Sequence, residues 1–168
     1  MGRTKALIDV DGLPMARRVE TALRSGGCSE VVVVGGDTDE LAVLDLPIVG
    51  DRYPGEGPVG GLLTALHHFA DGHVMVVACD LPALSATAVD RMLGAFARSS
   101  ADAVVARTSR AEPLCAVWRA TALPPVQAAF DGGIRAMHRV LDELAVDHVT
   151  LEGDTLHNVN HPADLPGP

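Results

Sequence analysis

Lysine and cysteine are the scarce residues of this sequence, and their distribution excludes several classes of protein. Lys5 is the single lysine, so arginine supplies the other twelve of the thirteen lysine and arginine side chains. The three cysteines lie far apart and form no Cys-X-X-Cys pair, so a structural zinc site or a disulfide framework is not expected. The seven histidines show no His-Glu-X-X-His spacing or similar metal-binding pattern.

Long apolar runs and basic clusters are missing as well. No apolar run reaches the ~18 residues that a membrane-spanning helix needs, and the first residues lack the apolar stretch of a signal peptide. The formal net charge is −9, and no basic face is present that could bind nucleic acid. We therefore expect a cytoplasmic protein that binds neither membranes nor nucleic acids.

What is present is the composition of a globular α/β protein. The 168 residues are 48% hydrophobic and 21% charged, and no long linker divides them, which predicts a single domain over residues 1–168. Apolar runs alternate with amphipathic segments, a pattern typical of a mostly parallel sheet. Strands are predicted over residues 30–34 and 73–78, where the apolar residues that follow Glu30 and His73 are continuous, as expected for strands that helices cover on both faces. Weaker strands are predicted near residues 46–49, 102–106, 113–118 and 146–151.

Helical spacing of apolar residues predicts the elements between these strands. A helix over residues 15–23 should end at Gly26-Gly27, and Pro58 should lie in the first turn of another. Ser85 is a plausible N-cap of a third helix. A helix near residues 120–130 is interrupted early by its two prolines, and the apolar spacing over residues 134–144 predicts a last long helix.

The glycine-rich loop at residues 51–61 is the first candidate ligand site. Its four glycines remove side chains and let a ligand approach the backbone, and the helix that follows presents free N–H groups suited to phosphate. The alternative is a tight surface turn that needs glycine for its conformation. Gly55, Gly57 and Gly60 also fit the Gly-X-Gly-X-X-Gly pattern, with Asp80 about 20 residues on, so an NAD-binding oxidoreductase is a minor alternative.

The second candidate is the loop that begins with Cys79 and Asp80, directly after the apolar run at residues 74–78. A carboxylate at the carboxyl end of a strand points into the ligand crevice of a parallel sheet and is a natural ligand for Mg²⁺. The alternative is an Asx-turn before Pro82. We expect Cys79 to behave as a small buried hydrophobic residue.

Five segments in a fixed order give this sequence a resemblance to a known family. They are residues 1–7, residues 51–61, the Cys-Asp-Leu-Pro of residues 79–82, the Glu-Pro-Leu of residues 112–114, and the Asn-Val-Asn-His-Pro-Ala-Asp-Leu of residues 158–165. Together they resemble the molybdenum cofactor guanylyltransferases, nearly from end to end. The resemblance implies a three-layer, Rossmann-like nucleotidyltransferase fold with a mostly parallel central sheet.

The resemblance also implies a reaction and roles for individual residues. A phosphate of molybdopterin would attack the α-phosphate of GTP and release pyrophosphate, with Mg²⁺ as cofactor and with proteins of the cofactor pathway as further partners. Asp80 would hold the metal, Lys5 would neutralise the triphosphate, and Arg135 would meet the pterin phosphate. Gly2, Arg3, Asp51, Gly57 and Gly60 would complete the nucleotide site. Asn158 and Asn160 would approach the metal or the second substrate.

Three departures from the family pattern keep other functions open. The pattern begins with a strand and a glycine-rich loop ending in Arg-Met-Gly, of which this sequence contains only the Met-Gly. Thr4 replaces an aspartate that often precedes the lysine, and Gly35-Gly36 stands where guanylyl enzymes can carry an asparagine for the base. The alternatives are a truncated, non-catalytic homologue that binds a nucleotide or a partner protein of the pathway, and a cytidylyl or sugar nucleotidyltransferase.

Overall fold

The computed structural model describes residues 4–156 and residue 159. Its strands are β1 (Asp9–Val10), β2 (Leu13–Pro14), β3 (Val33–Val34), β4 (Ile48–Val49), β5 (His73–Val77), β6 (Ala103–Arg107), β7 (Ala111–Arg119) and β8 (Val146–Thr150). Its α-helices are α1 (Met15–Ser25), α2 (Thr38–Leu41), α3 (Pro58–His68), α4 (Ala86–Arg98), α5 (Leu123–Asp131) and α6 (Met137–Leu141). Short 3-10 helices are η1 (Lys5–Leu7), η2 (Ala42–Leu44), η3 (Ala120–Ala122) and η4 (Gly153–Leu156). Among these residues, no helix is long and apolar enough to cross a membrane.

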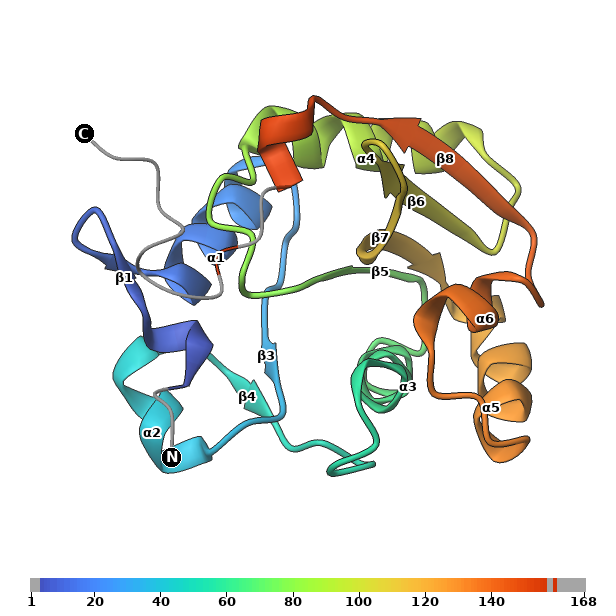
Figure 1. Ribbon diagram of the computed structural model, residues 1–168, viewed down its shortest axis with the longest axis horizontal. Helices are drawn as coiled ribbons and strands as arrows, with labels where there is room; N and C mark the ends of the chain where they lie inside the picture. Colours follow the sequence, from blue (N-terminus) through green and yellow to red (C-terminus); the bar gives the residue numbers. More distant parts are fainter. Residues whose placement is uncertain (1–3, 157–158, 160–168) are drawn as a thin grey trace.

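The main sheet has four strands in the order β5-β7-β6-β8 (Figure 1). β7 runs antiparallel to both β5 and β6, and β8 runs parallel to β6. β5, β6 and β8 therefore point in one direction, with β7 reversed between β5 and β6. The parallel pair β3-β4 and the antiparallel hairpin β1-β2 form separate small sheets.

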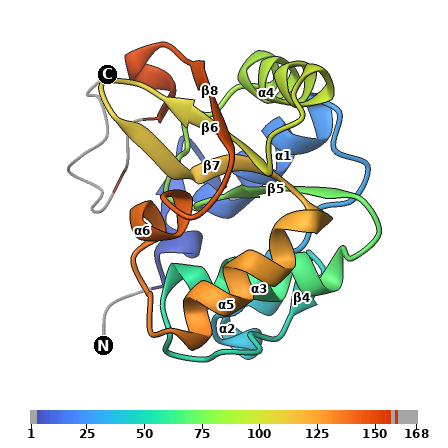
Figure 2. The same ribbon diagram turned by 90° about the vertical axis from the view of Figure 1, so that its right-hand side faces the viewer.

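Helices cover both faces of the main sheet, as Figure 2 shows with α1 and α4 on one side and α3 and α5 on the other. Side chains alternate across a strand. Met75 and Val77 of β5 accordingly pack in the core with α1 and α4, whereas Val74 and Val76 pack in the core with α3 and α5. The predicted three-layer α/β arrangement with mostly parallel strands is confirmed.

Several helix ends lie where the local sequence places them. Gly26 is the C-cap of α1, Pro58 occupies the first turn of α3, and the Ser85 hydroxyl accepts the Ala88 N–H at 3.2 Å as N-cap of α4. The two prolines that were expected to interrupt a helix instead fall in the first turn of α5, where a missing N–H has no helical partner to lose.

The prediction of a last long helix over residues 134–144 is wrong. α6 has five residues, and Ala136 before it is extended. Gly133 adopts a positive φ of 89°, and the chain therefore turns after α5 and does not continue as a helix. Ile134, Leu141 and Leu144 still pack against the core, so their apolar spacing reflects burial by a turn, a short helix and a second turn.

The predicted strands over residues 30–34 and 73–78 are less buried than expected for strands that helices cover on both faces. Val104 and Val105 of β6 are 1% and 0% exposed, whereas residues 32–34 and 74–77 are only partly buried. β3 is also shorter than the predicted strand over residues 30–34. Both runs line one cleft of about 610 Å³, which accounts for their exposure.

Candidate active site

Lys5 and Asp80 come together although 75 positions separate them in the sequence. The Lys5 ammonium lies 3.5 Å from Oδ2 of Asp80. The Asp80 side chain is 16% exposed and the Lys5 side chain 49% exposed. Lys5 begins η1, and Asp80 lies just beyond the carboxyl end of β5. The pair therefore brings a cation to the strand end where the sequence predicts a ligand crevice.

The other carboxylate oxygen of Asp80, Oδ1, differs from Oδ2 in its hydrogen bonding. Oδ1 is buried and, among the residues that the structure describes, has no hydrogen-bond partner. A buried carboxylate oxygen without a donor is costly unless a ligand satisfies it. Mg²⁺ prefers carboxylate oxygen and takes its remaining ligands from water and substrate phosphates, so one protein carboxylate fits it. Within residues 4–156 and 159, no cluster of three acidic, histidine or cysteine ligands could hold a metal ion without such phosphates.

The backbone around Asp80 is held by a distant part of the chain. The N–H of Val159 donates to the Asp80 carbonyl at 3.0 Å. Val159 itself is 2% exposed and belongs to a small core with Ile8, Val10 and Met15. It lies in the sequence between Asn158 and Asn160. These two asparagines, together with Gly2 and Arg3, fall outside the described residues.

Asp51 is fixed at the start of the glycine-rich loop, just after β4. Its Oδ1 accepts the Tyr53 N–H at 2.9 Å and the Thr64 hydroxyl at 3.0 Å. Thr64 is fully buried in α3 and also accepts the Arg52 N–H at 3.0 Å. These bonds make an Asx-turn and tie it to the helix that follows. Asp51 packs beside Gly35, where an added Cβ would come within 3.3 Å of the Asp51 Cβ.

Gly57 and Gly60, the two candidate glycines of this loop, have different structural surroundings. Gly60 lies inside α3, where an added Cβ would meet the Tyr53 Cβ at 3.0 Å and the Tyr53 carbonyl at 3.1 Å. Close packing of loop on helix is therefore sufficient to require glycine there. Gly57 precedes α3 with a φ of 74°, and no atom lies within 4 Å of an added Cβ. The approach to the N-terminus of α3 is open at Gly57.

Arg135 contacts the same glycine-rich loop through Glu56. Its guanidinium forms an ion pair with Glu56 and donates to the Phe130 carbonyl at 2.6 Å. It also stacks 3.6 Å from the centroid of the Phe130 ring. These contacts attach Arg135 to the glycine-rich loop and to α5, whereas Lys5 and Asp80 form a pair of their own.

The carboxyl ends of β3 and β5 both border the cleft, and β4 is the parallel neighbour of β3. Gly35 and Gly36 follow β3, Asp51 follows β4, and Cys79 follows β5; the two glycines, Cys79 and Lys5 line the cleft. Burial, with the neighbouring Asp80 charge, raises the pKa of the Cys79 thiol. Cys79 therefore stays a neutral thiol at physiological pH, as expected for a small apolar residue rather than a nucleophile.

Three residues of this region were not found from the sequence. Thr64 orients Asp51, Glu56 pairs with Arg135, and Val159 holds the Asp80 backbone. Thr64 carries a signal, because it is the one polar residue in the apolar stretch at residues 62–66 of α3. Glu56 and Val159 lie within two of the segments that carry the family resemblance, but the sequence does not show their contacts with Arg135 and Asp80.

Comparisons with known proteins identify the family of the chain. Residues 1–157 match the family model of the MobA-like NTP transferase domain. The chain is 33% identical over 175 residues to a probable molybdenum cofactor guanylyltransferase of Carboxydothermus hydrogenoformans, covering 98% of this chain and 86% of the relative. It is 30% identical over 162 residues to the molybdenum cofactor guanylyltransferase of Serratia proteamaculans, covering 95% and 82% of the two chains.

Solved structures show the same fold. Molybdopterin-guanine dinucleotide biosynthesis protein A from Archaeoglobus fulgidus superposes with a TM-score of 0.78 at 23% identity, covering 95% of this chain and 86% of that one. The 2-C-methyl-D-erythritol 4-phosphate cytidylyltransferase of Thermus thermophilus gives a TM-score of 0.71 at 19% identity, covering 95% and 89%. The family match spans nearly the whole described chain, and the predicted resemblance is confirmed: the chain belongs to the MobA-like NTP transferase family and is a nucleotidyltransferase.

Proposed function

We propose that this nucleotidyltransferase moves GMP from GTP to the phosphate of molybdopterin and releases pyrophosphate. The proposal takes its substrates from the guanylyltransferase names of the curated relatives. The observation that carries it is the Lys5–Asp80 pair, in which one carboxylate oxygen faces a cation and the other has no donor among the described residues. That asymmetry suits a site where a metal ion and a polyphosphate meet.

Asp80 is the proposed metal ligand, through the buried Oδ1. Mg²⁺ bound there would neutralise charge on the phosphates during transfer. The protein's own part is positioning, because phosphoryl-type transfers need in-line geometry and charge neutralisation more than covalent help. The acceptor phosphate oxygen forms the new bond to the α-phosphorus as the bond to pyrophosphate breaks.

Lys5 is the proposed cation for the triphosphate. The protein carries a formal charge of −9, so each cation at the site matters for two anionic substrates. The N-terminus of α3 at Gly57 offers free N–H groups to phosphate, and Gly60 lets the loop pack closely behind it. Asp51, held by Tyr53 and Thr64, lies near the nucleoside in this proposal.

The acceptor side of the site is proposed at Arg135. Its guanidinium is held by Glu56 and Phe130 at the far edge of the glycine-rich loop, where it would meet the pterin phosphate. Gly2 and Arg3 for the nucleotide, and Asn158 and Asn160 for the metal or second substrate, stay predictions. So do the partnership with pathway proteins and the cytoplasmic location.

A second candidate function is nucleotide binding without turnover, for which the cleft of about 610 Å³ gives a specific reason. The cleft ends beside Lys5 and leaves two apolar strands partly exposed, so the phosphate side of the site has an open wall. A chain with this wall open would bind GTP and fail to align it for attack.

Calorimetric titration with GTP, CTP and NAD, with and without Mg²⁺, separates these functions from one another. The proposed function predicts Mg²⁺-dependent binding that prefers GTP, followed by release of pyrophosphate when molybdopterin is added. Binding without product supports the second candidate. Preference for CTP would place the chain with cytidylyltransferases, and tight metal-independent binding of NAD would overturn both.

A further inference from the structure

Arg18 lies on α1 and binds two segments that are far apart in the sequence. Its Nε–H donates to the Pro82 carbonyl at 3.3 Å, and its Nη1 donates to the Val10 carbonyl and to Oδ2 of Asp11, each at 3.2 Å. Pro82 belongs to the loop that contains Asp80, whereas Val10 belongs to the hairpin β1-β2. One guanidinium therefore joins that loop to the hairpin, and it does so mainly through backbone carbonyls.

The loop that Arg18 binds is also held at Asp80 itself. The Val159 N–H donates to the Asp80 carbonyl at 3.0 Å. Leu81, the next residue, is 4% exposed and packs in the core with α1 and α4. The carbonyls on either side of this buried leucine are thus both bound by groups from outside the loop. Contacts of this kind fix the direction in which a ligating side chain points.

The hairpin that Arg18 binds follows directly after Lys5. The Ile8 N–H donates to the Lys5 carbonyl at 3.0 Å, so η1 leads straight into the hairpin. Val10 of the hairpin packs in one small core with Val159. The bonds of Arg18 and this core therefore both set the position of the lysine relative to the loop.

We propose that Arg18 is a positioning residue for the Lys5–Asp80 pair, and that it acts through the backbone of the loop and the hairpin. The inference rests on the proposed function, in which Asp80 holds Mg²⁺ and Lys5 neutralises the triphosphate. The two side chains lie 3.5 Å apart but belong to different elements, so their alignment depends on contacts between elements. A misplacement of about 1 Å in a catalytic site can cost about 100-fold in rate.

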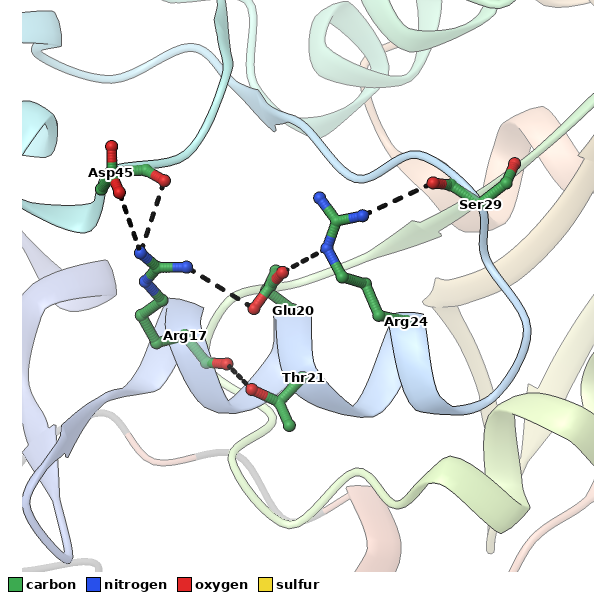
Figure 3. A network of polar contacts seen from close by, with 6 residues as sticks. All are labelled: Arg17, Glu20, Thr21, Arg24, Ser29 and Asp45. Atoms are coloured by element: carbon green, nitrogen blue, oxygen red, sulfur yellow. Dashed lines mark hydrogen bonds and ion pairs between the residues drawn. The ribbon is translucent and has the colours of Figure 1, made fainter.

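Arg17, the neighbouring residue on α1, is the matched control. The side chains of Arg17 and Arg18 are both 32% exposed. Arg17 pairs with Glu20 and reaches Asp45, as Figure 3 shows. Within the part of the chain that the structure describes, it has no hydrogen bond to residues 79–82. Replacing either arginine with methionine removes the same groups, but only Arg18→Met releases the loop.

Calorimetric titration with GTP, with and without Mg²⁺, tests the proposal. The ratio of the two affinities measures how well the metal site is formed, and a general loss of stability does not change it. We expect this ratio to fall about 10- to 100-fold in Arg18→Met, as when a residue that orients a metal ligand is removed. It should keep the parent value in Arg17→Met. A parent ratio in Arg18→Met, or an equal fall in both variants, overturns the proposal.

Two further variants show which contact of Arg18 matters. Arg18→Lys keeps the charge but lacks the planar fork, so its ratio should lie between those of Arg18→Met and the parent chain. If Arg18→Met does not fold, a parent ratio in Arg18→Lys overturns the proposal. The Asp11 side chain is 81% exposed, so its ion pair is weak and Asp11→Asn should keep the parent ratio. A fall in Asp11→Asn equal to that in Arg18→Met would contradict a role through the two carbonyls.

Asp80→Asn and amide hydrogen exchange separate this inference from the proposed function. If Asp80→Asn lowers the ratio and Arg18→Met does not, the inference fails and the proposed function stands. If the ratio is the same in Asp80→Asn and the parent chain, the proposed metal ligand is wrong, and exchange without substrate decides the inference. Arg18→Met should then speed exchange at residues 79–84 about 2- to 10-fold relative to Arg17→Met, since the loop loses a bond. Equal exchange in the two variants overturns the positioning role.

Discussion

Valine-rich strands occur in both the four-stranded sheet and the amino-terminal half of the molecule, but they differ in burial. In the four-stranded sheet, Val104 and Val105 are 1% and 0% exposed, between strands on both sides and helices on both faces. In the amino-terminal half, residues 32–34 are an equally apolar run, yet they stay partly exposed beside a cleft. The burial of a valine therefore depends on whether its strand has neighbours, which the valine run itself does not specify.

The candidate site lies where these two regions join. Lys5 belongs to the region with the open sheet edge, and Asp80 follows a strand of the four-stranded sheet. Their contact at 3.5 Å thus depends on how the two regions are packed against each other. Substitutions of Lys5 or Asp80, of core residues within one region, or of residues that link the regions therefore all test how the two regions are packed together.

The largest effect is expected at the pair itself. Asp80→Asn keeps the side-chain shape but removes the charge, and Lys5→Ala removes the cation. In the GTP-dependent transfer assay we expect kcat/KM to fall roughly 100- to 1000-fold for Asp80→Asn and roughly 10- to 100-fold for Lys5→Ala. The double variant should lose less than the product of the two, because the groups act together.

A carboxylate outside the site provides the control for that experiment. Asp90 is exposed on α4, and Asp90→Asn should leave the rate unchanged. Full activity of Asp80→Asn, with the circular dichroism of the parent chain, would remove Asp80 from the mechanism.

Thiol reactivity gives the next largest contrast between the regions. Burial raises the pKa of Cys115 to about 12, so at pH 8 its thiolate fraction is about 1000-fold below that of a thiol at the ordinary 9.0. Burial also raises the pKa of Cys28 and Cys79, but both line the cleft. We expect iodoacetamide to modify Cys28 first and Cys79 more slowly, with Cys115 unmodified until the protein unfolds. Rapid native labelling of Cys115 would contradict the closed sheet.

How far the sequence could anticipate this structure depends on the range of the interaction involved. Pro58, Ser85 and Gly26 mark helix ends through local chemistry, and all three do so in the structure. The hairpin β1-β2 also has a local signal, the Asp11-Gly12 dipeptide, and both residues adopt positive φ in the structure. Residues 134–144 misled because apolar spacing alone cannot distinguish a long helix from a short one between two turns.

The contacts of the candidate site were harder to predict from the sequence, because they join residues that lie far apart in the chain. Nothing in spacing joins Lys5 to Asp80, and only the resemblance to a family suggested that both belong to one site. The order β5-β7-β6-β8 decides which strand ends meet, and pairing over such distances leaves no mark in either segment. The support of Asp51 by Thr64 and of Arg135 by Glu56 is likewise a product of the fold.

A matched pair of valine substitutions measures the difference in packing directly. Val105→Ala removes buried methyl groups from the closed sheet and should cost about 2–3 kcal/mol of unfolding free energy, since a cavity remains. Val33→Ala removes the same atoms from the edge of the cleft and should cost less than about 1 kcal/mol. Urea denaturation followed by circular dichroism gives both values. Equal costs would show that the two regions are packed alike.

The smallest effect is expected in the links that hold the open region to α1. Figure 3 shows Glu20 between Arg17, which reaches Asp45 after η2, and Arg24, which reaches the Ser29 carbonyl before β3. Glu20→Gln should cost about 0.5 kcal/mol of unfolding free energy, because the carboxylate is 11% exposed but its arginine partners are partly solvated. Glu143→Gln, at an exposed position after α6, is the control and should be neutral. If hydrogen exchange at residues 31–34 rises in Glu20→Gln alone, the arginines hold the cleft wall through this carboxylate. If both variants match the parent chain, the open region owes its position to its apolar contacts with α1 instead.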